Sequence, residues 1–130
     1  MLSKLLLAVF LGACIGLERE IRSKPAGVRT CSLVALASAL FTLLGIAFGA
    51  GSDPSRLAAA VIQGIGFLGA GTILIYKEKI IGLTTSAIVW TVCAIGMACG
   101  TGHTVLALEA TGIVLSITLL VTPLERRFLN

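Results

Sequence analysis

The chain has 130 residues, of which 57% are hydrophobic and 12% are charged. Soluble domains carry about 25% charged residues, so the 10 Lys and Arg and 6 Asp and Glu of this chain are too few to cover a water-exposed surface. The mean hydropathy of +1.06 indicates an all-α integral membrane protein. These values argue against a soluble enzyme, a nucleic-acid-binding protein and a disordered chain.

Apolar runs between the charges predict a bundle of five transmembrane helices in one domain that covers residues 1–130. A helix crosses a bilayer with about 20 apolar residues. The first run is long enough only when it extends to the charged residues 18–20, whereas the uncharged runs 30–52 and 57–76 each match one span. The uncharged run 80–108 is too long for one span and breaks near its Gly-Thr-Gly-His sequence. We expect helices over residues 2–22, 31–50, 54–76, 84–99 and 104–123.

Lys and Arg residues predict the orientation, because cytoplasmic loops of membrane proteins concentrate these cations. With the N-terminus outside, only Lys4 and Arg56 lie on the outer side. The other cations lie on the cytoplasmic side: Arg19, Arg22, Lys24, Arg29, Lys77, Lys79, Arg126 and Arg127. We therefore expect an external N-terminus and a cytoplasmic C-terminus. The sequence Leu11–Cys14 resembles a lipoprotein cleavage box, but cleavage there would reverse this charge bias.

Glycines are concentrated in the third predicted helix, at Gly64, Gly66, Gly69 and Gly71. The first three match a dinucleotide-binding pattern, which has meaning only between a strand and a helix. In an apolar run, small residues instead allow helices to approach closely, so we expect this helix to lie centrally in the bundle. The alternative is a locally unwound stretch that lines a pore.

Polar residues of the predicted cytoplasmic face form the main candidate site. Glu18, Arg19 and Glu20 close the first helix, and a loop with Lys24 and Arg29 follows; Thr84 and Thr85 open the fourth helix on the same side. One interpretation is a set of solvated helix ends with an i,i+4 pair of Glu18 and Arg22. The other is a site for a cation or an acidic group. Carboxylate oxygens are ligands that Mg²⁺ prefers, so Glu18 and Glu20 are the candidate metal ligands, and no other cofactor is expected.

Besides Lys4, three charged residues lie toward the predicted outer side. Asp53 precedes Pro54 and is expected to cap the third helix, and Arg56 follows in its first turn. Glu109 lies about five residues inside the fifth helix, where a charge is costly, so a functional role or a buried partner is the default hypothesis. The alternative is that its side chain reaches water at the outer boundary. The sequence shows no pair of nucleophile and base, and we expect no enzymatic activity.

Several blocks, in order along nearly the whole chain, resemble the MgtC/SapB family of bacterial inner-membrane proteins. The blocks are Gly16-Leu17-Glu18-Arg19-Glu20, Lys24-Pro25-Ala26-Gly27-Val28-Arg29-Thr30, Asp53 with Arg56-Leu57-Ala58-Ala59, Gly64-Ile65-Gly66-Phe67-Leu68-Gly69-Ala70-Gly71, and Gly82-Leu83-Thr84-Thr85 with Trp90. The chain departs from the family pattern at Cys31, Ala60 and Gln63, where histidine, glutamine and a small hydroxyl residue are common. Longer members of this family add a soluble cytoplasmic domain, and the resemblance implies that this chain corresponds to the transmembrane domain only.

The resemblance implies a five-helix membrane domain with a role in adaptation to magnesium limitation and, in pathogens, in survival inside host cells. It favours a regulatory function through membrane partners, with ATP synthase as an implied target. The alternative is an oligomeric Mg²⁺ transporter or channel with residues 64–71 as the pathway and Glu18, Glu20 or Glu109 as ligands. The small-residue faces favour a homo-oligomer in either case.

Overall fold

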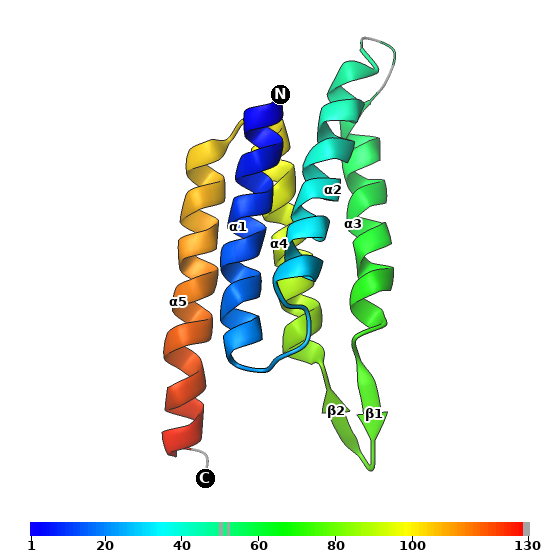
Figure 1. Cartoon of the computed structure of the whole chain (residues 1–130). Helices are drawn as coiled ribbons and strands as arrows, with labels where there is room; N and C mark the ends of the chain where they lie inside the picture. Colours follow the sequence, from blue (N-terminus) through cyan, green and yellow to red (C-terminus); the bar gives the residue numbers. More distant parts are fainter. Residues whose placement is uncertain (50, 52, 129–130) are drawn as a thin grey trace.

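The computed structural model describes residues 1–49, 51 and 53–128, and these residues form five helices and one β-hairpin (Figure 1). The helices are α1 (Leu2–Ile21), α2 (Val28–Ala47), α3 (Pro54–Ala70), α4 (Leu83–Thr101) and α5 (Thr104–Phe128), and the hairpin strands are β1 (Leu74–Tyr76) and β2 (Lys79–Ile81). Successive helices run in opposite directions, so the N-terminus and C-terminus lie at opposite ends of the bundle. The α1–α2 loop and the hairpin lie at the same end as the C-terminus (Figure 1).

The centre of the bundle consists of α1, α2 and α4, which pack along one another at glycines. A Cβ atom added at Gly12 of α1 would lie 2.6 Å from the carbonyl oxygen of Cys31 in α2. A Cβ atom at Gly96 of α4 would overlap the carbonyl oxygen of Ala35, also in α2. These glycines let the helix backbones touch, which is how helices associate where lipid removes the hydrophobic drive between them.

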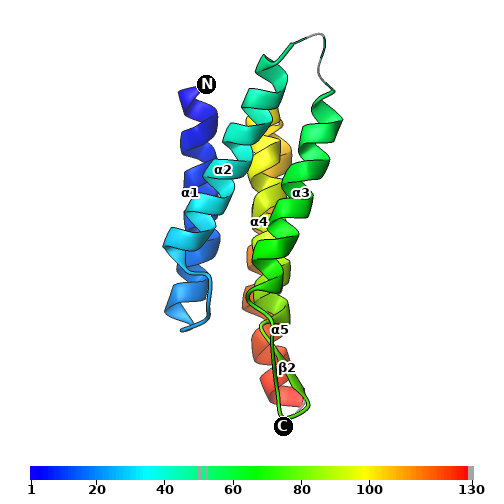
Figure 2. The same ribbon diagram turned by 90° about the vertical axis from the view of Figure 1, so that its right-hand side faces the viewer.

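Helix α3 lies at the edge of the bundle, so the prediction of a central third helix is wrong. Its main contacts are with α2 and α4, and Gly69 is its one buried residue in the described chain. Figure 2 shows α3 beside α4, away from α1. The glycines that bring backbones together are those of α1 and α4, whereas a Cβ atom at Gly64 or Gly66 would meet open space. Glycine content therefore did not identify the central helix.

The third helix also ends earlier than predicted, at Ala70 instead of residue 76. The following apolar residues form the antiparallel hairpin, with Ile75 paired to Ile80. Lys77 and Glu78 both have positive φ angles (44° and 66°) and form its two-residue turn. The chain enters α4 at Gly82, whose φ of 90° is in the left-handed region that favours glycine. Because α3 is a regular helix through Ala70, the alternative of an unwound stretch from Gly64 is wrong over that range.

The other helix ends differ modestly from the predicted ones. Helix α2 begins at Val28, three residues earlier than expected, and its predicted end at residue 50 lies outside the described residues. Helix α4 reaches Thr101, and α5 continues past Pro123 to Phe128. Proline removes one backbone N–H donor from a helix, but α5 continues through Pro123 without a break.

Three helices of the described chain are long and apolar enough to cross a membrane: α2, α4 and residues 104–125 of α5. Helix α1 has the length but carries charged residues at its C-terminal end, and α3 has 17 residues. Both pack lengthwise against the helices that meet the criterion (Figures 1 and 2). The fold is therefore that of a helical membrane protein.

The packing role of the glycines is tested by a matched pair of variants. Gly96→Ala places a methyl group against the backbone of α2, and we expect a loss of about 1–3 kcal/mol in the free energy of unfolding. Gly64→Ala adds the same methyl group in open space, and we expect no loss, since alanine favours helix. Thermal unfolding in detergent measures both. Equal stability of the two variants would contradict the proposed close packing of α4 on α2.

Candidate functional site

Arg19 joins three parts of the chain at the end of α1. The residue is 5% exposed. Its Nη2 donates to Oγ1 of Thr85 at 2.6 Å, and its Nε donates to the carbonyl oxygen of Pro25 at 3.3 Å. Thr85 lies in the first turn of α4, and Pro25 lies in the α1–α2 loop. The guanidinium is the group with enough donors in a planar fork to bind both acceptors at once. It therefore ties α1, the loop and α4 together.

Glu18 is also buried, with a side chain 7% exposed. Its Oε1 lies 2.8 Å from Nε of Arg22, one helical turn further along α1, as the i,i+4 spacing predicted. Its Oε2 is buried without a hydrogen-bond partner in the described structure. A carboxylate oxygen removed from water without a partner costs free energy, so this oxygen is the unsatisfied acceptor of the site.

Glu20 has a separate role from Glu18. Its Oε2 accepts a hydrogen bond from the backbone N–H of Val28 at 3.0 Å, at the start of α2. Helix starts carry unpaired N–H groups and partial positive charge, and α2 has no side-chain cap of its own at Gly27. Glu20 therefore caps α2 from α1. Residues two apart on a helix point to different sides, a signal already present in the sequence that argued against a shared carboxylate pair.

The structure does not bring the whole predicted cluster together. Lys24, Arg29 and Thr84 are exposed, whereas Glu18, Arg19 and Thr85 are buried together. Lys24 and Arg22 line a cavity of about 420 Å³ between the end of α1 and Pro123 of α5, which the sequence did not indicate. Within the described residues, no group of three His, Cys, Asp or Glu side chains is arranged to hold a metal ion.

At the other end of the bundle, Asp53 caps α3 as predicted. Its Oδ1 accepts from the hydroxyl of Ser55 at 2.7 Å and from the backbone N–H of Ser55 at 2.9 Å. These hydrogen bonds stabilise the carboxylate and lower the pKa of Asp53. Arg56 and Glu109 are both exposed, and neither side chain has a hydrogen bond or ion pair within the described chain. Glu109 therefore has no buried partner among the residues that the structure describes.

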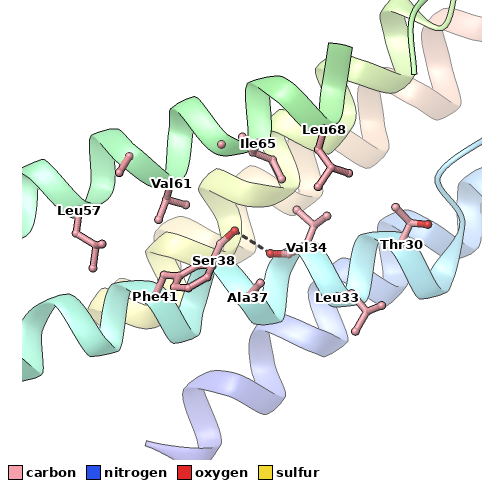
Figure 3. A pocket seen from close by; sticks show the side chains of 12 residues that line it. Thr30, Leu33, Val34, Ala37, Ser38, Phe41, Leu57, Val61, Ile65 and Leu68 are labelled. Atoms are coloured by element: carbon pink, nitrogen blue, oxygen red, sulfur yellow. Dashed lines mark hydrogen bonds between the residues drawn. The ribbon is translucent and has the colours of Figure 1, made fainter. Parts of the chain in front are cut away.

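A groove of about 610 Å³ lies between α2 and α3 (Figure 3). Its lining is almost entirely apolar and includes Phe41, Leu57 and Ile65. The hydroxyl of Ser38 in its wall donates to the carbonyl oxygen of Val34 at 2.7 Å, so it is satisfied within α2. Gly64 borders this groove, and Gly66 and Gly69 border a smaller one between α3 and Trp90. No charged side chain of the described chain lines the groove, so it is not suited to hold a cation, and only the arrangement of the helices reveals it.

Comparison with known proteins places the chain in one family. The sequence model described as "MgtC family" matches residues 5–127. An uncharacterized protein of Haemophilus influenzae is 44% identical over 98% of this chain and 58% of its own length. The "Putative magnesium transporter YhiD" of Escherichia coli K12 is 44% identical over 76% of this chain and 50% of its own length. "Protein MgtC" of Brucella abortus is 41% identical over 90% of this chain and 49% of its own length.

The chain spans about half the length of the curated relatives that it matches. No solved structure matches it. The resemblance inferred from the sequence blocks is confirmed by the family match, which extends over all five helices.

The hydrogen bond between Arg19 and Thr85 is tested by replacing neighbouring threonines. Thr85→Val removes the acceptor and leaves a buried guanidinium donor unpaired, and we expect a loss of about 1–3 kcal/mol in unfolding free energy. Thr84→Val changes an exposed residue and should have little effect. Chemical or thermal unfolding of the detergent-solubilised variants gives the comparison. A Thr85→Val variant as stable as Thr84→Val would show that the bond does not hold α1 to α4.

Proposed function

We propose, for a chain that belongs to the MgtC family, that it is a five-span protein of the bacterial inner membrane that supports adaptation to magnesium limitation by binding other membrane proteins. The family match and the names of the relatives identify a membrane protein of MgtC type related to magnesium. The polar side chains of the bundle support regulation rather than ion transport as its role.

The proposal rests on where the buried polar side chains lie and on what they hydrogen-bond to. In the described chain they are Glu18, Arg19, Ser38, Thr85 and Thr111. Midway along the bundle only the two hydroxyls remain, and each donates to a carbonyl oxygen of its own helix. Arg19 and Thr85 bond to each other at one end. The interior of a single copy therefore offers hydrocarbon and satisfied hydroxyls to an ion that would cross it, which favours a role through partners.

The proposed topology places both termini by charge. Arg19, Arg22, Lys24 and Lys77 lie in the segments at the end of the bundle that holds the C-terminus (Figure 1), and the cation-rich end is cytoplasmic by the positive-inside rule. Helix α1 has 20 residues, enough for about 30 Å of bilayer. Its charged residues then lie at the cytoplasmic boundary, which is where such side chains are tolerated.

Magnesium transport is the second candidate, and one observation favours it. Oε2 of Glu18 is a buried carboxylate oxygen with no hydrogen-bond partner among the described residues, and carboxylate oxygens suit Mg²⁺. One relative also carries the name "Putative magnesium transporter YhiD". A transport pathway would have to lie between copies, since the interior of one copy is apolar midway along the bundle.

The topology is tested by labelling single added cysteines in intact cells. Ser23→Cys lies in the α1–α2 loop, and Gly51→Cys follows α2 at the opposite end. A membrane-impermeant maleimide is expected to label Gly51→Cys from outside and Ser23→Cys only after the membrane is permeabilised. The unmodified chain gives the background from its four native cysteines, three of which are buried. The reverse labelling pattern would overturn the proposed orientation.

Regulation and transport are separated by a flux assay paired with growth. Proteoliposomes that contain the chain and a Mg²⁺-sensitive dye are expected to show no flux above protein-free vesicles at any imposed potential. The same chain is expected to restore growth in low magnesium to a strain that lacks its own MgtC protein. Glu18→Gln keeps the size of the side chain and removes its charge, and we expect it to preserve growth if folding is preserved. Mg²⁺ flux that Glu18→Gln abolishes would establish transport instead.

A further inference from the structure

Helices α3 and α5 form the two opposite edges of the bundle (Figure 1). Helix α3 packs on α2 and α4, and α5 packs on α4 and α1. Each edge helix therefore turns one face away from the rest of the chain. Both helices begin at the same end of the bundle and run in the same direction (Figure 1).

The outer face of α3 carries a glutamine at the middle of the bundle. Leu57 packs against Gly45 in the last turn of α2, and Gly69 packs against Ser86 in the first turn of α4. Gln63 lies midway between these two contacts along α3, on the opposite side of the helix. It is exposed, and its amide has no hydrogen bond within the described chain. An amide that faces hydrocarbon without a partner is costly.

The outer face of α5 likewise carries a polar side chain without a partner in the described chain, here the charged Glu109. Ala107 and Thr111 are the buried residues of α5 in the described chain. Glu109 and Ser116 lie on the other side, and both are exposed. Gly112 lies between them, and a Cβ atom there would meet open space. Ser116 donates its hydroxyl proton to the carbonyl oxygen of Gly112 at 2.7 Å, which leaves its oxygen free to accept.

The two faces match in register. Seven residues separate Arg56 from Gln63 on α3, and seven separate Glu109 from Ser116 on α5, so each pair lies on one helical face. Arg56 and Gln63 are the third and tenth residues of α3, and Glu109 and Ser116 are the sixth and thirteenth of α5. Glu109 thus lies three positions further into α5 than Arg56 lies into α3, and the same difference separates Ser116 from Gln63. One parallel alignment therefore sets cation beside anion and amide beside hydroxyl.

We propose that copies of this chain bind edge to edge in the membrane, with α3 of one copy against α5 of the next. Arg56 pairs with Glu109, and the amide of Gln63 donates to Oγ of Ser116. Ala59 and Gly112, each three residues after the charged residue, let the two backbones approach. The inference rests on the five-span arrangement of the proposed function. It is a heterologous contact, so each copy uses both edges and the assembly extends or closes into a ring.

Charge decides between this contact and a symmetric pair. Two copies that met through α3 alone would place Arg56 beside Arg56, and two that met through α5 would place Glu109 beside Glu109. Like charges repel, and each symmetric pair would leave the other edge's charge in lipid without a partner. The contact of α3 with α5 neutralises both.

Cysteine cross-linking between differently tagged copies tests the pairing. We expect a disulfide between Gln63→Cys in one copy and Ser116→Cys in the other after oxidation in native membranes, and neither variant should cross-link to itself. Ile62→Cys replaces Gln63→Cys as the control, because residue 62 lies about 100° away around the helix. The unmodified chain gives the background of the native cysteines. Self-linking of Gln63→Cys, or equal linking of Ile62→Cys, would overturn the proposal.

A charge exchange supplies a second test that does not depend on cysteine. Arg56→Glu or Glu109→Arg alone should weaken association by roughly tenfold, measured as the oligomer fraction in nanodiscs by native mass spectrometry. The double variant restores opposite charges and should restore the oligomer, which also shows that the changed chains fold. Glu125→Arg, at the far end of α5, is the control and should have no effect. Single variants with an unchanged oligomer fraction, or a double variant without rescue, would overturn the contact.

Labelling separates failure of the contact from failure of the topology. If a water-soluble maleimide reaches Gln63→Cys in membranes as readily as Ser23→Cys, α3 is not in the bilayer, and both the five-span proposal and the edge contact are wrong. If Gln63→Cys is protected but no cross-link to Ser116→Cys forms, the edge contact alone is wrong. Growth in low magnesium is read in the same cells and reports on the proposed function independently.

Discussion

Helices in a bilayer gain nothing by hiding apolar side chains from one another, so a small bundle must be held by contacts between backbones. In this chain that closeness is supplied by the glycines of α1 and α4, which let both helices reach the backbone of α2. With α1, α2 and α4 packed together, α3 lies against α2 and α4 at one edge, and α5 lies against α4 and α1 at the other. These edge positions leave one face of α3 and one face of α5 turned outward, with the polar residues that each face carries.

The polar residues at the end of the bundle that holds the C-terminus reinforce the same three helices. Arg19 bridges α1 to α4, and Glu20 bridges α1 to the start of α2. Both are charged groups that satisfy backbone or hydroxyl partners, and hydrogen bonds to charged groups are stronger than neutral ones. Arg19 and Glu20, which belong to the sequence block from Gly16 to Glu20, therefore serve mainly to join helix ends. Oε2 of Glu18 does not take part in these contacts and has no hydrogen-bond partner among the described residues.

Much of the helical arrangement could be predicted from where charges are absent. Five helices were expected and five are present in the described chain, because breaks at Pro54, Gly82 and Gly102 are local chemistry that a sequence displays. The hairpin was missed because the run from Ile73 to Tyr76 is apolar, and a short apolar run does not distinguish strand from helix. The edge position of α3 was missed because glycines on a helix indicate that something can come close, not which helix does. The separate roles of Glu18 and Glu20 were within reach, since i and i+2 diverge on a helix.

The length of α3 has a consequence for the surrounding lipid. Its 17 residues extend about 25 Å, which is shorter than the hydrocarbon thickness of about 30 Å in a typical bilayer. Helix α5, at the opposite edge of the bundle, has 25 residues. In the proposed five-span arrangement, α3 is a short span that compresses the lipid beside it, and each ångström of mismatch costs a fraction of a kcal/mol. The chain would thus deform the lipid at the α3 edge of the bundle and not at the α5 edge, and a protein that covers α3 would relieve that elastic stress.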